Sequence, residues 1–129
     1  MKVLTLHGPW APAIAYLGKT FENRTWKPPE WLIGQPLAIH AGMTWDCADE
    51  QWIEETFGRT LLPEQRITGA ILCLIPQVKP AVMHSVSPWF FGPYGWPMDD
   101  VRVLLDPFPI KGQQGLWDCW NPALECVLR

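Results

Sequence analysis

The chain has 129 residues, of which 48% are hydrophobic and 18% charged, a balance typical of a folded chain rather than a disordered one. This length allows one well-buried core and is too short for two, so we predict a single domain over residues 1–129. The net charge of −3 argues against a protein that grips long nucleic acid mainly through phosphate contacts, because such binding uses many lysines and arginines.

Charge is unevenly distributed along the chain. Residues 1–42 carry four basic and two acidic residues, net +2, whereas residues 43–129 carry six basic and eleven acidic residues, net −5. We therefore expect any anion site to lie in the first third. No stretch approaches the roughly 20 apolar residues that span a bilayer, and the N-terminus lacks a secretory signal. These features predict a soluble, cytoplasmic protein with no membrane partner.

The cysteines indicate buried free thiols. They stand at wide, irregular spacings with no Cys-x-x-Cys pair, which suggests neither a zinc finger nor a disulfide framework: Cys47, Cys73, Cys119 and Cys126. A mixed His and Cys site, for example His40 with Cys47, has no ligand-spacing signature to favour it. We predict no metal and no cofactor.

Fourteen prolines cut the chain into short pieces, because each fixes φ and lacks an N–H donor. Residues 2–7 alternate apolar positions and predict a first strand. A short helix should follow from Gly8-Pro9-Trp10 and end at Gly18, and residues 19–26 should form the next strand.

Within the strand predicted over residues 19–26, period-two geometry places Glu22, Arg24 and Trp26 on one face and Phe21 on the other. An acid, a base and an indole would then share one surface. Lys19 has the opposite parity, so it joins that surface only from the turn after Gly18 or through a bulge.

The middle of the chain predicts a strand and then a helix. Residues 36–41 read as a strand that alternates between two faces; Leu37, Ile39 and Ala41 share one face, and Ala38 and His40 the other. A helix should run from Thr44, as N-cap, to Phe57, with Gly58 closing it. Its aromatic stripe of Trp45 and Trp52 is typical of core packing.

The second half begins with a near-continuous apolar run at residues 68–75, which predicts a strand buried on both faces. Residues 87–96 hold five aromatic side chains interrupted by Pro and Gly, which predicts an ordered aromatic loop. Strands are expected at residues 101–105 and 115–119, and Asn121-Pro122 should begin a short final helix.

The segment Gly18-Lys19-Thr20-Phe21-Glu22-Asn23-Arg24 resembles the Gly-x-Lys-x-x-Glu-x-Arg signature of ASCH domains, which are relatives of the PUA, EVE and YTH domains. Residues 7–11, 35–41, 87–96 and 111–117 are similar to other ASCH segments, in the same order, over about 110 residues. The resemblance implies an α+β, mainly β fold: a small PUA-like β-barrel of five to six strands with two to three flanking helices.

RNA binding is the role usually proposed for the ASCH family. Some relatives are reported as ribonucleases, and small bacterial ones as amidohydrolases that deacetylate N4-acetylcytidine, with a lysine matching Lys19 implicated in both. Two departures stand in the signature region: Lys19 directly follows Gly18, and Gly42-Met43 replaces a small residue followed by Lys. A threonine in the amidohydrolases also matches Glu22.

The resemblance and strand parity together nominate Lys19 and Glu22 as catalytic candidates and Arg24 as a ligand-binding candidate. A carboxylate beside two cations could move a proton, or Glu22 and Arg24 could form only a structural ion pair. For Lys19 the alternative is a solvated turn lysine, and the family match is what favours a functional role. His40 is a further ligand-binding candidate, with a hydrogen-bonded strand residue as the alternative to a catalytic base.

Aromatic rings are the remaining binding candidates, since stacking stabilises a bound base by about 1–3 kcal/mol. A small domain needs most of its large side chains for its core. Trp26 is favoured because it shares the face of Glu22 and Arg24, and Tyr94 follows because it lies on a Gly-flanked loop with a polar tip. Trp10 is a further ligand-binding candidate.

Three functions remain open. The first is an RNA- or nucleotide-binding module that inserts a single base, modified or not, into a cleft. The second is a hydrolase, either a ribonuclease or a modified-nucleoside amidohydrolase, that uses Lys19 and Glu22. The third is an accessory domain that binds a protein partner through its acidic second half.

Overall fold

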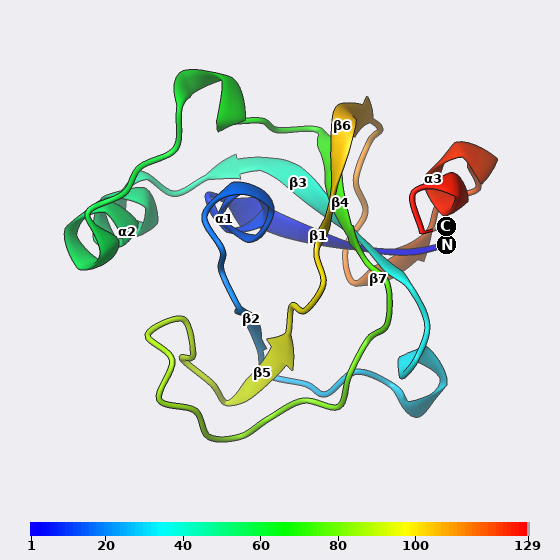
Figure 1. The fold of residues 1–129 in the computed structure, drawn as a ribbon, viewed down its shortest axis with the longest axis horizontal. Coiled ribbons are helices and arrows are strands. Elements are labelled where there is room, and N and C mark those ends of the chain that lie inside the picture. The colour runs from blue at the N-terminus through cyan, green and yellow to red at the C-terminus, as the bar shows by residue number, and fades with distance from the viewer. Residues whose placement is uncertain (129) are drawn as a thin grey trace.

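The computed structural model describes residues 1–128 as a mixed α and β fold in which strands predominate (Figure 1). The strands are β1 (Lys2–Gly8), β2 (Phe21–Arg24), β3 (Leu37–Trp45), β4 (Ala70–Ile75), β5 (Tyr94–Pro97), β6 (Arg102–Pro109) and β7 (Leu116–Asp118). The α-helices are α1 (Trp10–Tyr16), α2 (Cys47–Phe57) and α3 (Pro122–Cys126), and short 3-10 helices occur at Glu30–Leu32 and Pro63–Gln65.

The strands form two sheets. The larger has the order β6-β4-β3-β1-β7, in which β1 and β3 are parallel and the other neighbours antiparallel. The smaller is the antiparallel pair β2-β5, which Figure 1 shows set apart from the larger sheet. Among residues 1–128 no closed barrel is detected, because the large sheet ends at β6 and β7 and the small sheet does not join it in register.

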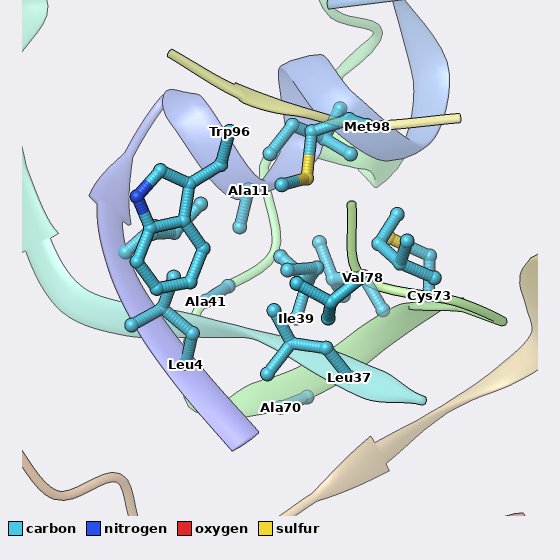
Figure 2. Close-up of a cluster of buried hydrophobic side chains, with 14 of the residues drawn as sticks. Leu4, Ala11, Leu37, Ile39, Ala41, Ala70, Cys73, Val78, Trp96 and Met98 are labelled. Carbon is cyan, nitrogen blue, oxygen red and sulfur yellow. The ribbon is translucent and has the colours of Figure 1, made fainter. Parts of the chain in front are cut away.

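The main core fills the space between the large sheet, α1 and β5. Figure 2 shows Trp96 extending toward Ala41 and Leu4 of the large sheet and Met98 ending near Ala11 of α1. The opposite face of that sheet packs against α3 through Leu124. Burial of large apolar side chains from both sheets is what fixes β5 over the large sheet, since each such side chain contributes about 1.5–3 kcal/mol.

Strand alternation follows the predicted parity in β3 and the predicted burial in β4. Leu37, Ile39 and Ala41 enter the main core, whereas Ala38 enters the second cluster. All six residues of β4 are buried and divide between the two clusters. The prediction of a strand buried on both faces is confirmed.

Several predicted boundaries were wrong. The strand expected at residues 101–105 continues to Pro109, because β6 pairs with β4 as far as Ala70. Thr44 and Trp45 belong to β3, and Asp46 caps α2 instead, its side chain accepting from the Asp49 N–H at 3.0 Å. Strand β2 covers only Phe21–Arg24, four residues of the eight expected. The predicted aromatic loop ends in strand β5, because Tyr94–Pro97 finds hydrogen-bonding partners in β2.

The α-helices of residues 1–128 are all short, and none is long and apolar enough to cross a membrane. Buried free thiols were predicted; all four cysteines are free, and Cys73 and Cys119 are buried, but the prediction of burial was wrong for Cys47 and Cys126, which are exposed. Burial raises the pKa of the Cys73 thiol to about 12, which keeps it protonated and unreactive at neutral pH.

Candidate functional site

A buried ion pair stands where α1 gives way to β2. Gly18 adopts a left-handed φ of 73°, which reverses the chain after α1, and the Lys19 N–H then donates to the Ala13 carbonyl at 3.1 Å. The Lys19 side chain is only 2% exposed, and its Nζ lies 2.9 Å from Glu22 Oε1. Lys19 thus reaches Glu22 from the turn, one of the two routes that its parity allowed.

Arg24 contacts the second oxygen of the same carboxylate. Its Nε lies 3.1 Å from Glu22 Oε2, and one terminal nitrogen donates to the Thr5 carbonyl at 3.3 Å. The Nε is buried and close enough for charge attraction, but its N–H is not aligned for a hydrogen bond to Glu22. Both Glu22 oxygens therefore face a cation, so this carboxylate positions Lys19 and Arg24.

Aromatic rings surround these charges. The Lys19 ammonium lies 5.0 Å from the centre of the Trp10 ring, and the Arg24 guanidinium 5.8 Å from that of Trp26, both within cation–π range. Trp26 packs edge-on against Trp96 with 4.9 Å between ring centres. The structure therefore brings together Lys19, Glu22, Arg24, Trp10 and Trp26.

A cavity of about 460 Å³ opens beside the guanidinium. We call it the arginine cavity; its lining includes Trp10, Trp45, Glu22, Arg24, Asp46 and Asp49. With His7 counted as neutral, Arg24 is the one positive charge of the lining against three carboxylates, so the formal charge of the cavity is −2. Lys19 and Trp26 are not among the residues that line this cavity. This polarity suits a neutral, flat ligand with polar edges better than an isolated anion.

His40 lies away from the arginine cavity. Its Nε2 is 2.7 Å from the Ile110 carbonyl, which places the ring proton on Nε2, and its Nδ1 is 3.2 Å from Thr5 Oγ1. The Trp117 indole N–H donates to the same Thr5 oxygen at 2.9 Å. His40 is buried and fully hydrogen-bonded, so its prominent role is to hold the segment at Ile110 against the large sheet.

Burial lowers the pKa of His40 below its ordinary value, and the hydrogen bond to Ile110 opposes this shift only in part. The unfolded chain then binds this proton at higher pH than the folded chain. The associated stability is complete above about pH 6.5 and is lost as the pH falls through the lowered folded-state pKa. We expect the free energy of unfolding, measured with urea, to decrease between pH 7 and pH 5.5.

The variant His40→Gln should lose that pH dependence, because glutamine does not titrate. His84→Gln, at an exposed histidine, should keep it. A pH profile of His40→Gln that parallels the wild-type profile would contradict the assignment to His40.

Tyr94 also lies outside the arginine cavity. It stands opposite Arg24 in the β2-β5 register, and its ring centre is 5.6 Å from Lys27 Nζ. Tyr94 is therefore a backbone neighbour of Arg24, but neither Tyr94 nor His40 lines the arginine cavity.

The sequence did not reveal two features of the site. One is the pair Asp46 and Asp49 at the start of α2, which line the arginine cavity, and the other is the Asn23 side chain. Asn23 Oδ1 accepts from the N–H groups of Phe91 and Gly92 at 2.8 and 3.1 Å, and its Nδ2 donates to the Trp89 carbonyl at 3.0 Å. This side chain ties the aromatic loop to β2. Its parity, opposite to Glu22 and Arg24, was the available signal.

Metal ligation finds no support in the described part of the chain, residues 1–128, where no group of three His, Cys, Asp or Glu side chains is placed to hold an ion. Comparison of the chain with protein-family models and with curated protein sequences finds no match. The evidence for a function is therefore the geometry of these residues and the sequence resemblance.

Proposed function

We propose that the chain is an ASCH-like domain that binds a single base, modified or not, of an RNA or a free nucleotide in the arginine cavity. The observation that carries the proposal is the Arg24 guanidinium. It is oriented by Glu22 and Thr5, remains 24% exposed, and lines a cavity that also contains the Trp10 ring.

A nucleobase matches the chemistry of this cavity. Its flat face can lie against an indole, and its edge carries carbonyl acceptors for Arg24 and, in several bases, amino donors for carboxylates. The three lining carboxylates disfavour a phosphate inside the cavity itself, whereas they do not disfavour a neutral base. The base is therefore the part of a nucleotide that fits here.

The proposed kinship with ASCH domains, and with it a PUA-like barrel arrangement, rests on the order of the similar sequence segments. Two features of the structure are compatible with it: the signature charges Lys19, Glu22 and Arg24 meet at one point, and strands predominate. The seven strands of residues 1–128 exceed the expected five to six by one or two.

Replacement of Arg24 by glutamine should weaken nucleoside binding by about 10- to 100-fold, because hydrogen bonds from a charged donor contribute about 1.5–3 kcal/mol. Titration calorimetry with a panel of normal and modified nucleosides measures this loss. Arg102→Gln, at an exposed arginine of β6 outside the arginine cavity, is the matched control and should bind as the wild type does. Failure of every nucleoside to bind the folded wild type would contradict the proposal.

A hydrolase is the second candidate, and the observation in its favour is the burial of Lys19 Nζ against Glu22 Oε1. Engagement of both Glu22 oxygens by cations suits positioning better than proton transfer. Incubation with RNA oligonucleotides and with N4-acetylcytidine distinguishes the candidates. Turnover that disappears in Lys19→Met would support a hydrolase, and binding without turnover would support the binding module.

A further inference from the structure

A second cavity adjoins the arginine cavity. It has a volume of about 800 Å³ and lies between the ends of β1 and β3 and residues 109–114. The two cavities share Leu6, His7 and Thr44 in their linings, so they meet at one wall. His7 is exposed at this wall. His7 and Thr44 are therefore exposed residues that the two cavities have in common.

The second cavity, which we call the lysine cavity, has the opposite charge. Lys111 is the one formally charged residue of its lining at neutral pH, and no carboxylate accompanies it. Gln113 and Gln114 add amide donors and acceptors from the same segment. The carboxylates of the arginine cavity disfavour a phosphate there. In the adjoining lysine cavity, a phosphate could instead bind the lysine ammonium and the amide N–H groups.

The wall that carries these groups is fixed to the large sheet. His40 Nε2 donates to the Ile110 carbonyl, and the segment then passes so close over His40 that a Cβ on Gly112 would lie 2.6 Å from His40 Cε1. The Ile110 N–H also donates to the Gly69 carbonyl at 3.1 Å. Lys111 is thus flanked by two anchored residues, which limits the entropy that binding must overcome.

We propose that the lysine cavity is a second subsite, which takes the phosphate and the adjoining nucleoside of a ligand whose base occupies the arginine cavity. This inference rests on the proposed function. It makes the preferred ligand at least a dinucleotide, with the backbone passing His7, the phosphate at Lys111 and the second nucleoside against the apolar floor around Leu6 and Met43. A nucleoside alone uses only half of the site.

Titration calorimetry with matched probes tests the subsite. The probes are cytidine, uridine, adenosine and guanosine, and the four dinucleoside monophosphates CpC, UpU, ApA and GpG. For the base that binds, the dinucleotide should bind about tenfold tighter than the nucleoside, as expected for an added charge-assisted contact. This gain should shrink as salt concentration rises.

Lys111→Gln should remove most of the gain and leave nucleoside affinity unchanged. Lys79→Gln, at an exposed lysine paired with Asp99 outside both cavities, should leave the gain intact. Equal affinities for nucleoside and dinucleotide, or a gain that survives Lys111→Gln, would overturn this inference alone. Absence of binding by all eight probes and by every modified nucleoside of the panel above would overturn the proposed function together with it.

Discussion

Replacement of Glu22 by leucine should lower the free energy of unfolding by about 3–5 kcal/mol, the cost of breaking a buried ion pair by removing one partner. Lys19 is 2% exposed and Glu22 Oε1 is the hydrogen-bond acceptor of its ammonium, so the variant leaves a buried cation without its carboxylate. The nearby Trp10 ring offsets this penalty only in part, because a cation–π contact contributes about 0.5–2 kcal/mol. Urea unfolding followed by tryptophan fluorescence measures the loss.

The double variant Lys19→Met with Glu22→Leu is the informative control. It removes the buried cation as well, so it should recover much of the stability lost in the single variant. A single variant within about 0.5 kcal/mol of the wild type, or a double variant that loses the sum of both single effects, would show that the pair does not hold the turn to β2.

Truncation of Trp96 to alanine should destabilise the fold by about 3–5 kcal/mol, the usual range for deleting a fully buried aromatic side chain. Trp96 is 0% exposed, packs edge-on against Trp26, and donates its indole N–H to the Trp26 carbonyl at 3.0 Å. Its loss also removes an apolar side chain of the small sheet that packs in one core with residues of the large sheet (Figure 2). Calorimetric or urea unfolding measures the change.

Trp120 supplies the matched control, since it is 88% exposed. Trp120→Ala should change the free energy of unfolding by no more than about 0.5 kcal/mol. Loss of less than about 1 kcal/mol in Trp96→Ala would contradict the assignment of Trp96 to the core.

The sequence predicted those strands and helix ends that are determined by residues close together in the chain. Strand β4 was identified because six consecutive apolar residues are too few for an independent helix, and the end of α2 because Gly58 readily takes its left-handed φ of 64°. The start of α2 was missed because Thr44 and Asp46 are both good N-caps. Tertiary pairing decided between them: Trp45 pairs with Gly8 of β1, and the Asp46 N–H donates to the Gly8 carbonyl at 2.9 Å.

The candidate site also has a part that the sequence could predict and a part that it could not. Strand parity predicted that Glu22 and Arg24 share a face, and it left open whether Lys19 joins them; the structure shows that it does, from the turn after Gly18. Sequence could not show that the start of α2 would bring Asp46 and Asp49 to the same cavity, because that contact depends on the path of β3 across the fold. The expectation of a basic site in the first third therefore missed the acidic side of the cavity.

An NMR titration of the indole N–H signals is the most direct test of base binding in the arginine cavity, because the chain has nine tryptophans as probes. Trp10 and Trp45 line the cavity, whereas Trp31 and Trp120 are exposed elsewhere. With saturating amounts of the tightest-binding nucleoside, we expect the Trp10 and Trp45 signals to shift and those of Trp31 and Trp120 to stay. Signals of Trp10 and Trp45 that remain unmoved at saturation would contradict base binding in this cavity.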